Sequence, residues 1–450
     1  MNQEFMRTRP VLPLVISMAL PMTISMLVNA LYNIVDSFFV AKISDDAMTA
    51  LSLVYPIQNL MMATTVGFGI GINAMIAYFL GAKREKEANI SASVGVVCNI
   101  FHGLLLTIGC ILVMPAFLKM FTKDATIIDL GLQYSNIVFL FAIPVSISIS
   151  LEKIFQSVGR MRTSMFCMII GCIANVVLDP LLIFGIGVFP KMGIEGAAIA
   201  TGVGEMVTLA GYIIIYFVKP ISVRINICYV KFRANILKRM YAIGVPATLN
   251  MALPSLQISV LNGILAVYSS AYVLVLGAYF KLQTFLYLTA NGVVQGMRPL
   301  LAYNYGAGEK KRVNQIYKTA LRIIAGVMVV GTLLCMSVPD KLIGLFTNNA
   351  QTIKIGQNAL RMISLGFVVS SVSVTASGAL EGLGKGVRSL VISLMRYLLI
   401  MLPVAFILSR SFGPSGVWSA FWITEFITAV VAHRLYAQCQ DTRSKKSETA

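Results

Sequence analysis

Long apolar stretches separated by short polar ones dominate this chain. Runs of roughly 18–25 apolar residues, the length that crosses a ~30 Å hydrocarbon core, recur along it. Each such run predicts a membrane-spanning helix, with ends set to within several residues. The predicted spans are 12–39, 50–80, 92–115, 133–156, 164–187, 193–218, 240–267, 272–302, 319–338, 357–380, 389–409 and 415–436. The pattern therefore predicts an all-α integral membrane protein with twelve transmembrane helices.

The composition agrees with this prediction. Hydrophobic residues make up 57% of the chain and charged residues 12%, whereas soluble domains carry about 25% charged residues. A soluble protein this apolar would lack the polar surface that keeps it dispersed. The chain is therefore expected to reside in the lipid bilayer.

The net charge of +18 is explained by where the basic residues lie. Lys and Arg gather near both termini and in every second connection, above all in 219–239, whereas the other connections carry few, such as Lys42 and Lys191. Positive charge marks the cytoplasmic face of a membrane protein. We therefore expect a multi-pass protein of a bacterial-type inner membrane with both termini in the cytoplasm, and no nucleic-acid partner.

The second half of the chain repeats the first. A shift of 225 residues aligns Pro21 with Pro246, Gln58 with Gln283, Gly67 with Gly292 and Gly71 with Gly296. A weaker match at another offset aligns Gly193 with Gly413. This predicts an N-lobe (1–218, six spans), a cytoplasmic linker (219–239), a C-lobe (240–436, six spans) and a cytoplasmic tail (437–450). Two pseudo-symmetric lobes of this kind favour a transporter.

Polar residues inside the first span form a stripe. Asn29, Tyr32, Asn33 and Asp36 are spaced so that all four share one helical face. An Asp at the bilayer centre costs about 2.5–3.5 kcal/mol on insertion scales, so Asp36 is a candidate functional residue. The alternative is that Asp36 lies near the helix end and is hydrated there.

A second polar group lies on spans 5 and 6. Asn175 and Asp179 are one turn apart, and so are Thr201 and Glu205. Asp179-Pro180 can also mark a kink, which is compatible with a site because a kink frees backbone carbonyls. Glu205 can instead face the membrane interface or pair with a Lys.

Two carboxylates with amides and hydroxyls around them suit a hard cation. Oxygen ligands fit Na⁺, and two desolvated carboxylates that repel each other favour H⁺ uptake. We expect H⁺ or Na⁺ as a coupling ion, with Na⁺ held near Asp36, Asn175, Asp179 and Thr201, and no other cofactor. The same groups make Asn29, Tyr32, Asn33 and Glu205 candidates for substrate contact or for support of the ion site.

The second half carries different polar groups. Span 8 holds Lys281, unusual enough at its depth to be a functional candidate or to neutralise a buried carboxylate, and Gln283. Glu381, Arg396 and Glu425 look scattered, and Glu381 is predicted to lie at the membrane interface.

Enzyme motifs are missing from the sequence. His102 and His433 are the only histidines and lie far apart, and the cysteines form no CxxC pair. Gly67-Phe-Gly69-Ile-Gly71 lies inside an apolar span without GK[ST], which favours close helix packing over nucleotide binding. We therefore expect no enzyme activity and no use of ATP.

Five motifs together resemble the multidrug and toxic compound extrusion (MATE) family over nearly the whole chain. They are Ile-Val-Asp36-Ser-Phe-Phe-Val, Tyr-Phe-Leu-Gly81-Ala82, Gln156-Ser-Val-Gly159-Arg160, Asn175-Val-Val-Leu-Asp179-Pro180 and Gly196-Ala-Ala-Ile-Ala-Thr201. The resemblance implies antiport of cationic or amphipathic compounds against H⁺ or Na⁺. It implies that Asp36, Asn175, Asp179 and Thr201 couple the ion, with Tyr134 as a further site residue. Ser255, Leu256 and Gln257 stand where another branch has a carboxylate, which favours the DinF-like branch.

The leading hypothesis is a multidrug efflux antiporter working by alternating access, most simply as a monomer. The alternative is a flippase for a lipid or lipid-linked substrate, built on the same superfamily architecture. A non-transporting membrane scaffold or receptor is the third reading, and the intramembrane carboxylates speak against it.

Overall fold

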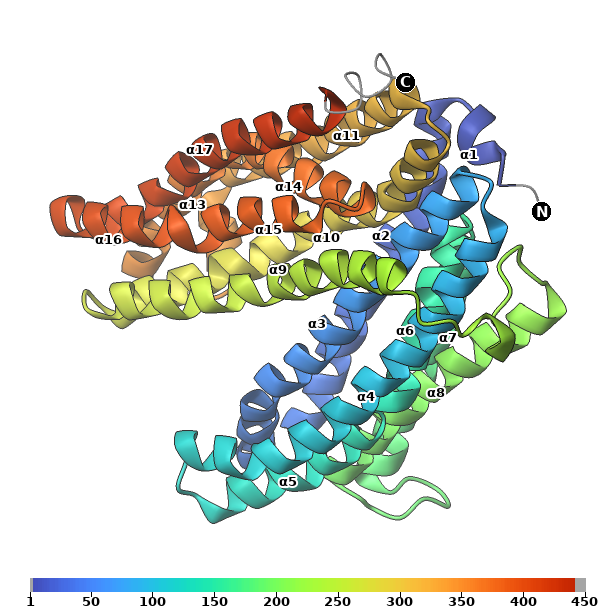
Figure 1. Ribbon diagram of the computed structural model, residues 1–450. Coiled ribbons are helices and arrows are strands. Elements are labelled where there is room, and N and C mark those ends of the chain that lie inside the picture. Colours follow the sequence, from blue (N-terminus) through green and yellow to red (C-terminus); the bar gives the residue numbers. More distant parts are fainter. Residues whose placement is uncertain (1–2, 442–450) are drawn as a thin grey trace. The chain divides into compact units, whose positions relative to one another are not determined.

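The computed structural model describes residues 3–441, and every regular element in that range is a helix (Figure 1). The end of the predicted tail, 442–450, lies outside the described residues. Within them, ten helical segments are long and apolar enough to cross a membrane. They are α2 (Val11–Ala41), α3 (Asp45–Gly81), α4 (Glu85–Phe121), α7 (Met161–Phe184), α8 (Ile194–Val218), α9 (Ala234–Ala266), α10 (Ser270–Gly306), α11 (Lys310–Ser337), the continuous run of α15 (Gly386–Leu394), η2 (Met395–Leu399) and α16 (Met401–Phe412), and α17 (Pro414–Asp441).

Two further spans are each built from a bent pair of helices. The axes of α5 (Ala125–Leu140) and α6 (Ala142–Ser157) differ by 46°, and those of α13 (Ala350–Ser364) and α14 (Phe367–Gly382) by 53°. In the first pair, Pro144 lies just after the break and has no N–H to continue the helix ladder. Counting each pair as one span gives twelve among the described residues, as predicted. The remaining short elements are α1 (Phe5–Thr8), η1 (Ile227–Tyr229) and α12 (Pro339–Gly344).

The helices pack into two compact units. Unit 1 is built on Ile24–Thr248, and unit 2 on Met6–Thr23 together with the described residues from Leu249 onward. The start of α2 thus belongs to unit 2 and the start of α9 to unit 1, whereas the sequence placed each helix wholly in its own lobe. Thr23 and Thr248, where the units divide, occupy equivalent positions in the repeat.

Glycines make this arrangement possible. A Cβ atom on Gly67 of α3 would lie 2.6 Å from the backbone nitrogen of Thr248 on α9. A Cβ atom on the equivalent Gly292 of α10 would lie 2.7 Å from that of Thr23 on α2. Each glycine therefore permits a close helix crossing inside its own unit. The prediction that the Gly67–Gly71 stretch serves helix packing is confirmed.

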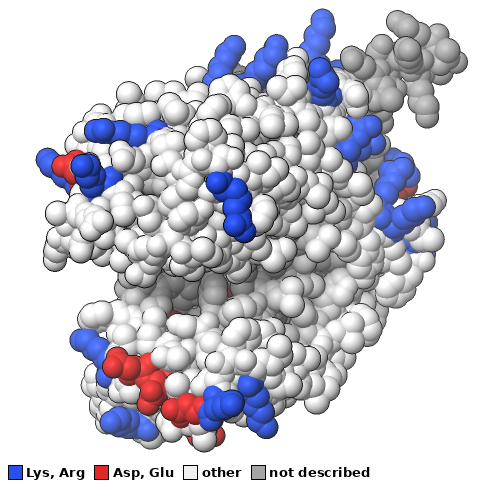
Figure 2. Space-filling model, turned by 90° about the vertical axis from the view of Figure 1, so that its left-hand side faces the viewer, with Lys and Arg blue, Asp and Glu red and all other residues white. Residues whose placement is uncertain are grey.

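The outer surface of the helices is apolar. Leu20 and Leu31 of α2, Leu112 of α4 and Phe217 of α8 are all exposed, and most of the surface visible in Figure 2 is uncharged. Apolar exposure on this scale is incompatible with a water-facing surface and fits contact with lipid chains. The core of unit 1 lies between α3, α4, α5 and α8, with Val54, Met114, Phe139 and Ala197 among its buried side chains.

Candidate functional site

Two carboxylates and an amide lie buried inside unit 1. Asp36 comes from the part of α2 that belongs to this unit, and Asn175 and Asp179 lie one turn apart on α7. Their exposed fractions are 8%, 2% and 0%. The charge of Asp36 acts on Asp179, so the two carboxylates are electrostatic neighbours. This burial does not support the alternative that Asp36 is a hydrated helix-end residue.

Most of the oxygen atoms of this group lack a partner. Among the described residues, Oδ1 of Asp36, Oδ1 of Asn175 and both carboxylate oxygens of Asp179 are buried without a hydrogen bond. Buried polar atoms are hydrogen-bonded in the great majority of cases, and exceptions call for an explanation such as an ion. A bound proton or Na⁺ would give these four acceptor oxygens the partner that they lack.

Thr201 and Tyr134 join the group from two other helices. The Asn175 Nδ2 atom donates to Oγ1 of Thr201 on α8 over 3.4 Å, which links α7 to α8. Tyr134 of α5 is 2% exposed, has Gln58 and Thr201 as polar neighbours, and lies within electrostatic reach of both carboxylates. The structure thus places these five predicted residues in one interior, which we call the acidic site: Asp36, Tyr134, Asn175, Asp179 and Thr201.

The rest of the predicted polar stripe lies beside this site. Tyr32 is half-buried and has Asp36 and Glu205 as charged neighbours. Glu205, also half-buried, has Glu152 as a charged neighbour and forms no ion pair with a Lys among the described residues. Asn33 is exposed, and its Nδ2 donates to the backbone oxygen of Asn29 over 2.7 Å. The stripe is therefore buried only along one edge.

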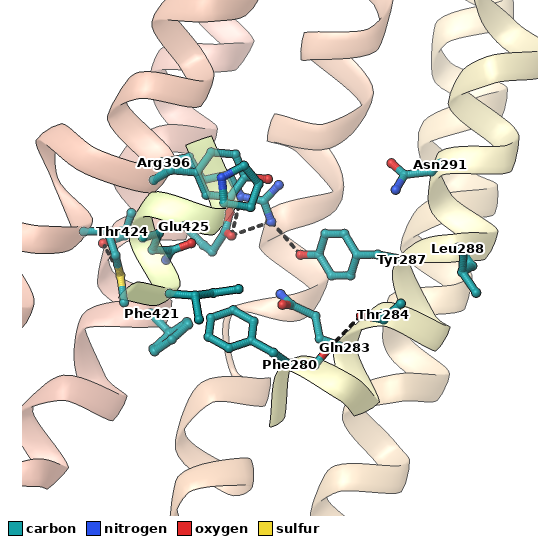
Figure 3. A pocket seen from close by; sticks show the side chains of 15 residues that line it. Phe280, Gln283, Thr284, Tyr287, Leu288, Asn291, Arg396, Phe421, Thr424 and Glu425 are labelled. Carbon is teal, nitrogen blue, oxygen red and sulfur yellow. Dashed lines mark hydrogen bonds and ion pairs between the residues drawn. The ribbon is translucent and has the colours of Figure 1, made fainter. Parts of the chain in front are cut away.

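Lys281 and Gln283 of α10 belong to unit 2. Lys281 is exposed, and its Nζ lies 5.8 Å from the centre of the Phe346 ring. It makes this cation–π contact and takes part in no ion pair among the described residues. Gln283 lines a cavity of about 280 Å³ inside unit 2 (Figure 3).

The sequence reading missed two buried ion pairs in unit 2. Glu381, predicted at the membrane interface, is 3% exposed, pairs with Arg298 and accepts from Asn250 Nδ2 over 2.8 Å. Arg396 and Glu425, which looked scattered, form an ion pair of 2.6 Å. Their similar depth in two consecutive, antiparallel spans is the signal that could have linked them.

A transition-metal centre is not found in the part of the chain that the structure describes, where no group of three His, Cys, Asp or Glu side chains could hold one. The acidic site has carboxylate, amide and hydroxyl oxygens, which are ligands for a hard ion such as Na⁺. All seven cysteines are free thiols.

Comparisons with known proteins agree with this architecture. The chain is 28% identical over 425 residues to the multidrug export protein MepA of Staphylococcus aureus, covering 94% of this chain and 93% of that protein. It is 26% identical to MepA of Staphylococcus saprophyticus, covering 92% and 91%.

Solved structures show the same fold. An outward-facing multidrug resistance MATE family transporter of the MOP superfamily superposes with a TM-score of 0.91 at 22% identity, covering 99% of both chains. A MOP superfamily transporter from Pyrococcus furiosus superposes with a TM-score of 0.89 at 22% identity, covering 98% of both. The MatE family model matches residues 21–181 and 246–407, one stretch in each repeat. The chain therefore belongs to the MatE family, that of the multidrug and toxic compound extrusion transporters.

Proposed function

We propose that this chain is a secondary active exporter that exchanges cationic or amphipathic organic compounds for H⁺ or Na⁺, with Asp36 and Asp179 as the coupling carboxylates. The observation that carries the proposal is the set of buried acceptor oxygens without partners on Asp36, Asn175 and Asp179. The similarity to MepA proteins, which are multidrug export proteins, supports the substrate class.

The physical argument follows from the cost of a buried charge. A carboxylate held away from water without a donor is strongly disfavoured as a bare anion. Asp36 and Asp179 are therefore stable when they share a proton or a cation and unstable when they lose it. Such a difference biases a protein with two conformations toward one of them. Each elementary charge that moves inward down the membrane potential releases about 2.3 kcal/mol per 100 mV.

The remaining residues of the acidic site take supporting roles in this proposal. Thr201 fixes the Asn175 amide through its hydrogen bond, so that the amide oxygen faces the same interior as the carboxylates. The lack of a carboxylate at Ser255, Leu256 and Gln257 on α9 supports the DinF-like branch, in which the ion site lies in the N-terminal half. The excess of basic residues in 219–239 supports a cytoplasmic position for that segment and for both termini.

Reconstitution into lipid vesicles tests the proposal. Vesicles loaded with ethidium, an aromatic cation, are given a proton or a sodium gradient in turn, and dye movement is measured. We expect one gradient to drive transport by the wild-type protein, and Asp36→Asn and Asp179→Asn each to abolish the driven component. Asp46→Asn, which removes an exposed carboxylate at the start of α3, is the matched control and is expected to transport normally.

Two outcomes would contradict the proposal. Gradient-driven transport that persists in Asp36→Asn would remove that carboxylate from coupling. Transfer of a fluorescent lipid between leaflets, with no dye movement under either gradient, would favour the lipid flippase instead.

A further inference from the structure

The cavity of about 280 Å³ in unit 2 contains a buried pair of opposite charges that the proposed export mechanism does not use. Arg396 lies in the middle of the span formed by α15, η2 and α16, and Glu425 in the middle of α17. Their side chains are 8% and 14% exposed. Both line the cavity, as Figure 3 shows.

A buried ion pair adds little net stability, because the desolvation of both ions offsets their attraction. Charged side chains within membrane spans therefore point to function by default. A local feature supports the same reading: Arg396 lies in a single π-helical turn, Met395–Leu399, within an otherwise α-helical span. Such turns occur often at functional sites. The repeat offers no counterpart, since the alignment of Gly193 with Gly413 places Val176 opposite Arg396.

The guanidinium group is held by a directed chain of hydrogen bonds. Nε of Arg396 donates to Oε1 of Glu425 over 2.7 Å, and Nη2 donates to the Tyr287 hydroxyl over 2.5 Å. The Tyr287 hydroxyl lies 2.9 Å from Oγ of Ser370, which in turn donates to the backbone oxygen of Phe367. This chain fixes the orientation of Arg396 and spares the N–H groups on Nη1, which take no part in it.

The Glu425 carboxylate can also accept a further hydrogen bond. Arg396 occupies Oε1 of Glu425, whereas among the described residues Oε2 accepts only from Ser373 Oγ, over 3.1 Å. That hydroxyl hydrogen is shared with the backbone oxygen of Ser370, at 2.9 Å. One donor group and one acceptor atom of opposite charge thus keep binding capacity on two residues that line the cavity.

The other walls are aromatic and amide. The rings of Phe280 and Phe421 line one side, and in Figure 3 the Gln283 amide points toward the same space as Arg396. Gln257, 5% exposed, adds a second amide. A volume of about 280 Å³ is at the small end of ligand sites, which limits the ligand to one compact ring system with a short polar side chain.

From this geometry we propose that the cavity in unit 2 is a binding site for small aromatic zwitterions. The ligand carboxylate meets Nη1 of Arg396, its ammonium group meets Oε2 of Glu425, and its ring lies against Phe280 and Phe421. A purely cationic ligand would face the guanidinium, and a purely anionic one the carboxylate. Both are therefore disfavoured by like-charge contact. In the acidic site of unit 1, in contrast, the buried side-chain atoms without a partner among the described residues are all acceptors.

The role of this site in transport rests on the proposed export function, but binding itself does not require transport. Three indole compounds separate the charge requirements: L-tryptophan carries both charges, tryptamine only the cation and indole-3-propionate only the anion. Binding of tritiated L-tryptophan to the full-length protein in lipid nanodiscs is measured by equilibrium dialysis, with the other two as competitors. We expect L-tryptophan to bind about tenfold more tightly than either analogue, as one lost charge-assisted contact implies.

Variants assign this preference to the ion pair. Arg396→Gln is expected to erase the preference over tryptamine, and Glu425→Gln the preference over indole-3-propionate. Because either change leaves a lone buried charge, Arg396→Gln with Glu425→Gln is the decisive variant, and it should bind all three compounds equally weakly. The matched control is Arg298→Gln with Glu381→Gln, which removes a buried ion pair of the same unit that does not line the cavity. It should keep the tenfold preference.

Three results would overturn the inference: no saturable L-tryptophan binding to the wild-type protein, equal binding of the three compounds, or a preference retained in the double variant of Arg396 and Glu425. Asp36→Asn separates this inference from the export proposal. Normal L-tryptophan binding together with undisturbed coupled efflux in that variant would contradict the coupling role of Asp36 and leave the zwitterion site unaffected. If Asp36→Asn loses coupled efflux and the wild-type protein does not bind L-tryptophan, the zwitterion site alone is contradicted.

Discussion

At the scale of single residues, the buried carboxylates are of two kinds, paired and unpaired, and in unit 1 Glu152 is paired with Lys153. In unit 2, Glu381 and Glu425 each have an arginine partner. In unit 1, Asp36 and Asp179 form no ion pair among the described residues, and three of their four oxygens lack any hydrogen bond. A paired carboxylate is already neutralised, whereas an unpaired one must find an ion. This contrast supports the proposal that ion coupling takes place in unit 1.

The hydrogen bond from Asn175 to Thr201 gives a prediction of its own. Thr201→Val removes the acceptor and frees the amide to rotate away from the carboxylates. One neutral hydrogen bond contributes about 0.5–1.5 kcal/mol, so the driving-ion concentration for half-maximal efflux should rise about two- to tenfold. Thr201→Ser keeps the hydroxyl and should restore the wild-type value. If valine and serine behave alike in a titration of efflux against ion concentration, the hydroxyl has no role in ion binding.

The sequence could predict part of this site and not the rest. Spacing placed Asp36 and Asn33 on one helical face, but such a face is wide, and only its Asp36 edge is buried. The exposed Asn33 side chain instead donates a hydrogen bond from Nδ2 to the Asn29 backbone oxygen. The pairing of Arg298 with Glu381 depends on packing between helices distant in sequence, which periodicity along one helix does not contain.

At the scale of helices, apolar runs located every span but not its real extent. The predicted span 50–80 is a helix of 37 residues, Asp45–Gly81, because a hydropathy pattern ends where polar residues begin while the hydrogen-bond ladder continues. The predicted span 133–156 is two helices with a bend of 46°, and the apolar pattern runs through the bend unchanged. The predicted span 164–187 ends early, at Phe184, because Gly185 adopts a left-handed conformation with φ of 72°.

Helix crossings at the paired glycines give the second prediction. Gly67→Ala and Gly292→Ala each place a methyl group within 2.8 Å of backbone atoms on the crossing helix, so the helices must separate. Overpacking of this kind costs about 1–3 kcal/mol. Both variants should unfold at lower denaturant concentration than the wild type, and by similar amounts because the two crossings are equivalent in the repeat.

Gly109→Ala is the control for these glycines. Apart from the local backbone of α4 itself, no atom of the described residues lies within 4 Å of a Cβ built at Gly109, and alanine favours a helix by about 1 kcal/mol relative to glycine. This variant should be as stable as the wild type or slightly more stable. A loss equal to that of Gly67→Ala would mean that the close crossing is not what the glycine serves.

At the scale of the whole molecule, the two repeats share their helix crossings but differ in their buried polar side chains. The glycine crossings recur in both units. In contrast, Arg298 and Glu381 align with Asn73 and Gln156, an exchange of a charged pair for two amides. Two copies of one helical frame thus carry unlike polar groups, which fits the proposed coupling site in one unit and the proposed ligand site in the other.

Orientation in the membrane decides which ends of the helices face the cytoplasm, and the cysteines offer a test of it. Cys228 is exposed in the segment between α8 and α9, Cys439 is half-buried and the other five are buried. Val188, between α7 and α8, is 93% exposed. In a Cys439→Ser background, a membrane-impermeant maleimide should label Cys228 only in inside-out vesicles. Val188→Cys should be labelled in intact cells, because consecutive connections lie on opposite sides of the membrane.

Basic residues on both sides of Cys228 are the physical basis for this expectation, since positively charged loops stay on the cytoplasmic side. The double variant of Cys228→Ser and Cys439→Ser is the control, and it gives the level of labelling that comes from the five buried cysteines. If intact cells label Cys228 and leave Val188→Cys untouched, the termini lie outside. An ion moving inward through the acidic site would then enter from the opposite end of the helices, and the proposed exchange would still export its organic substrate, because the ion gradient sets its direction.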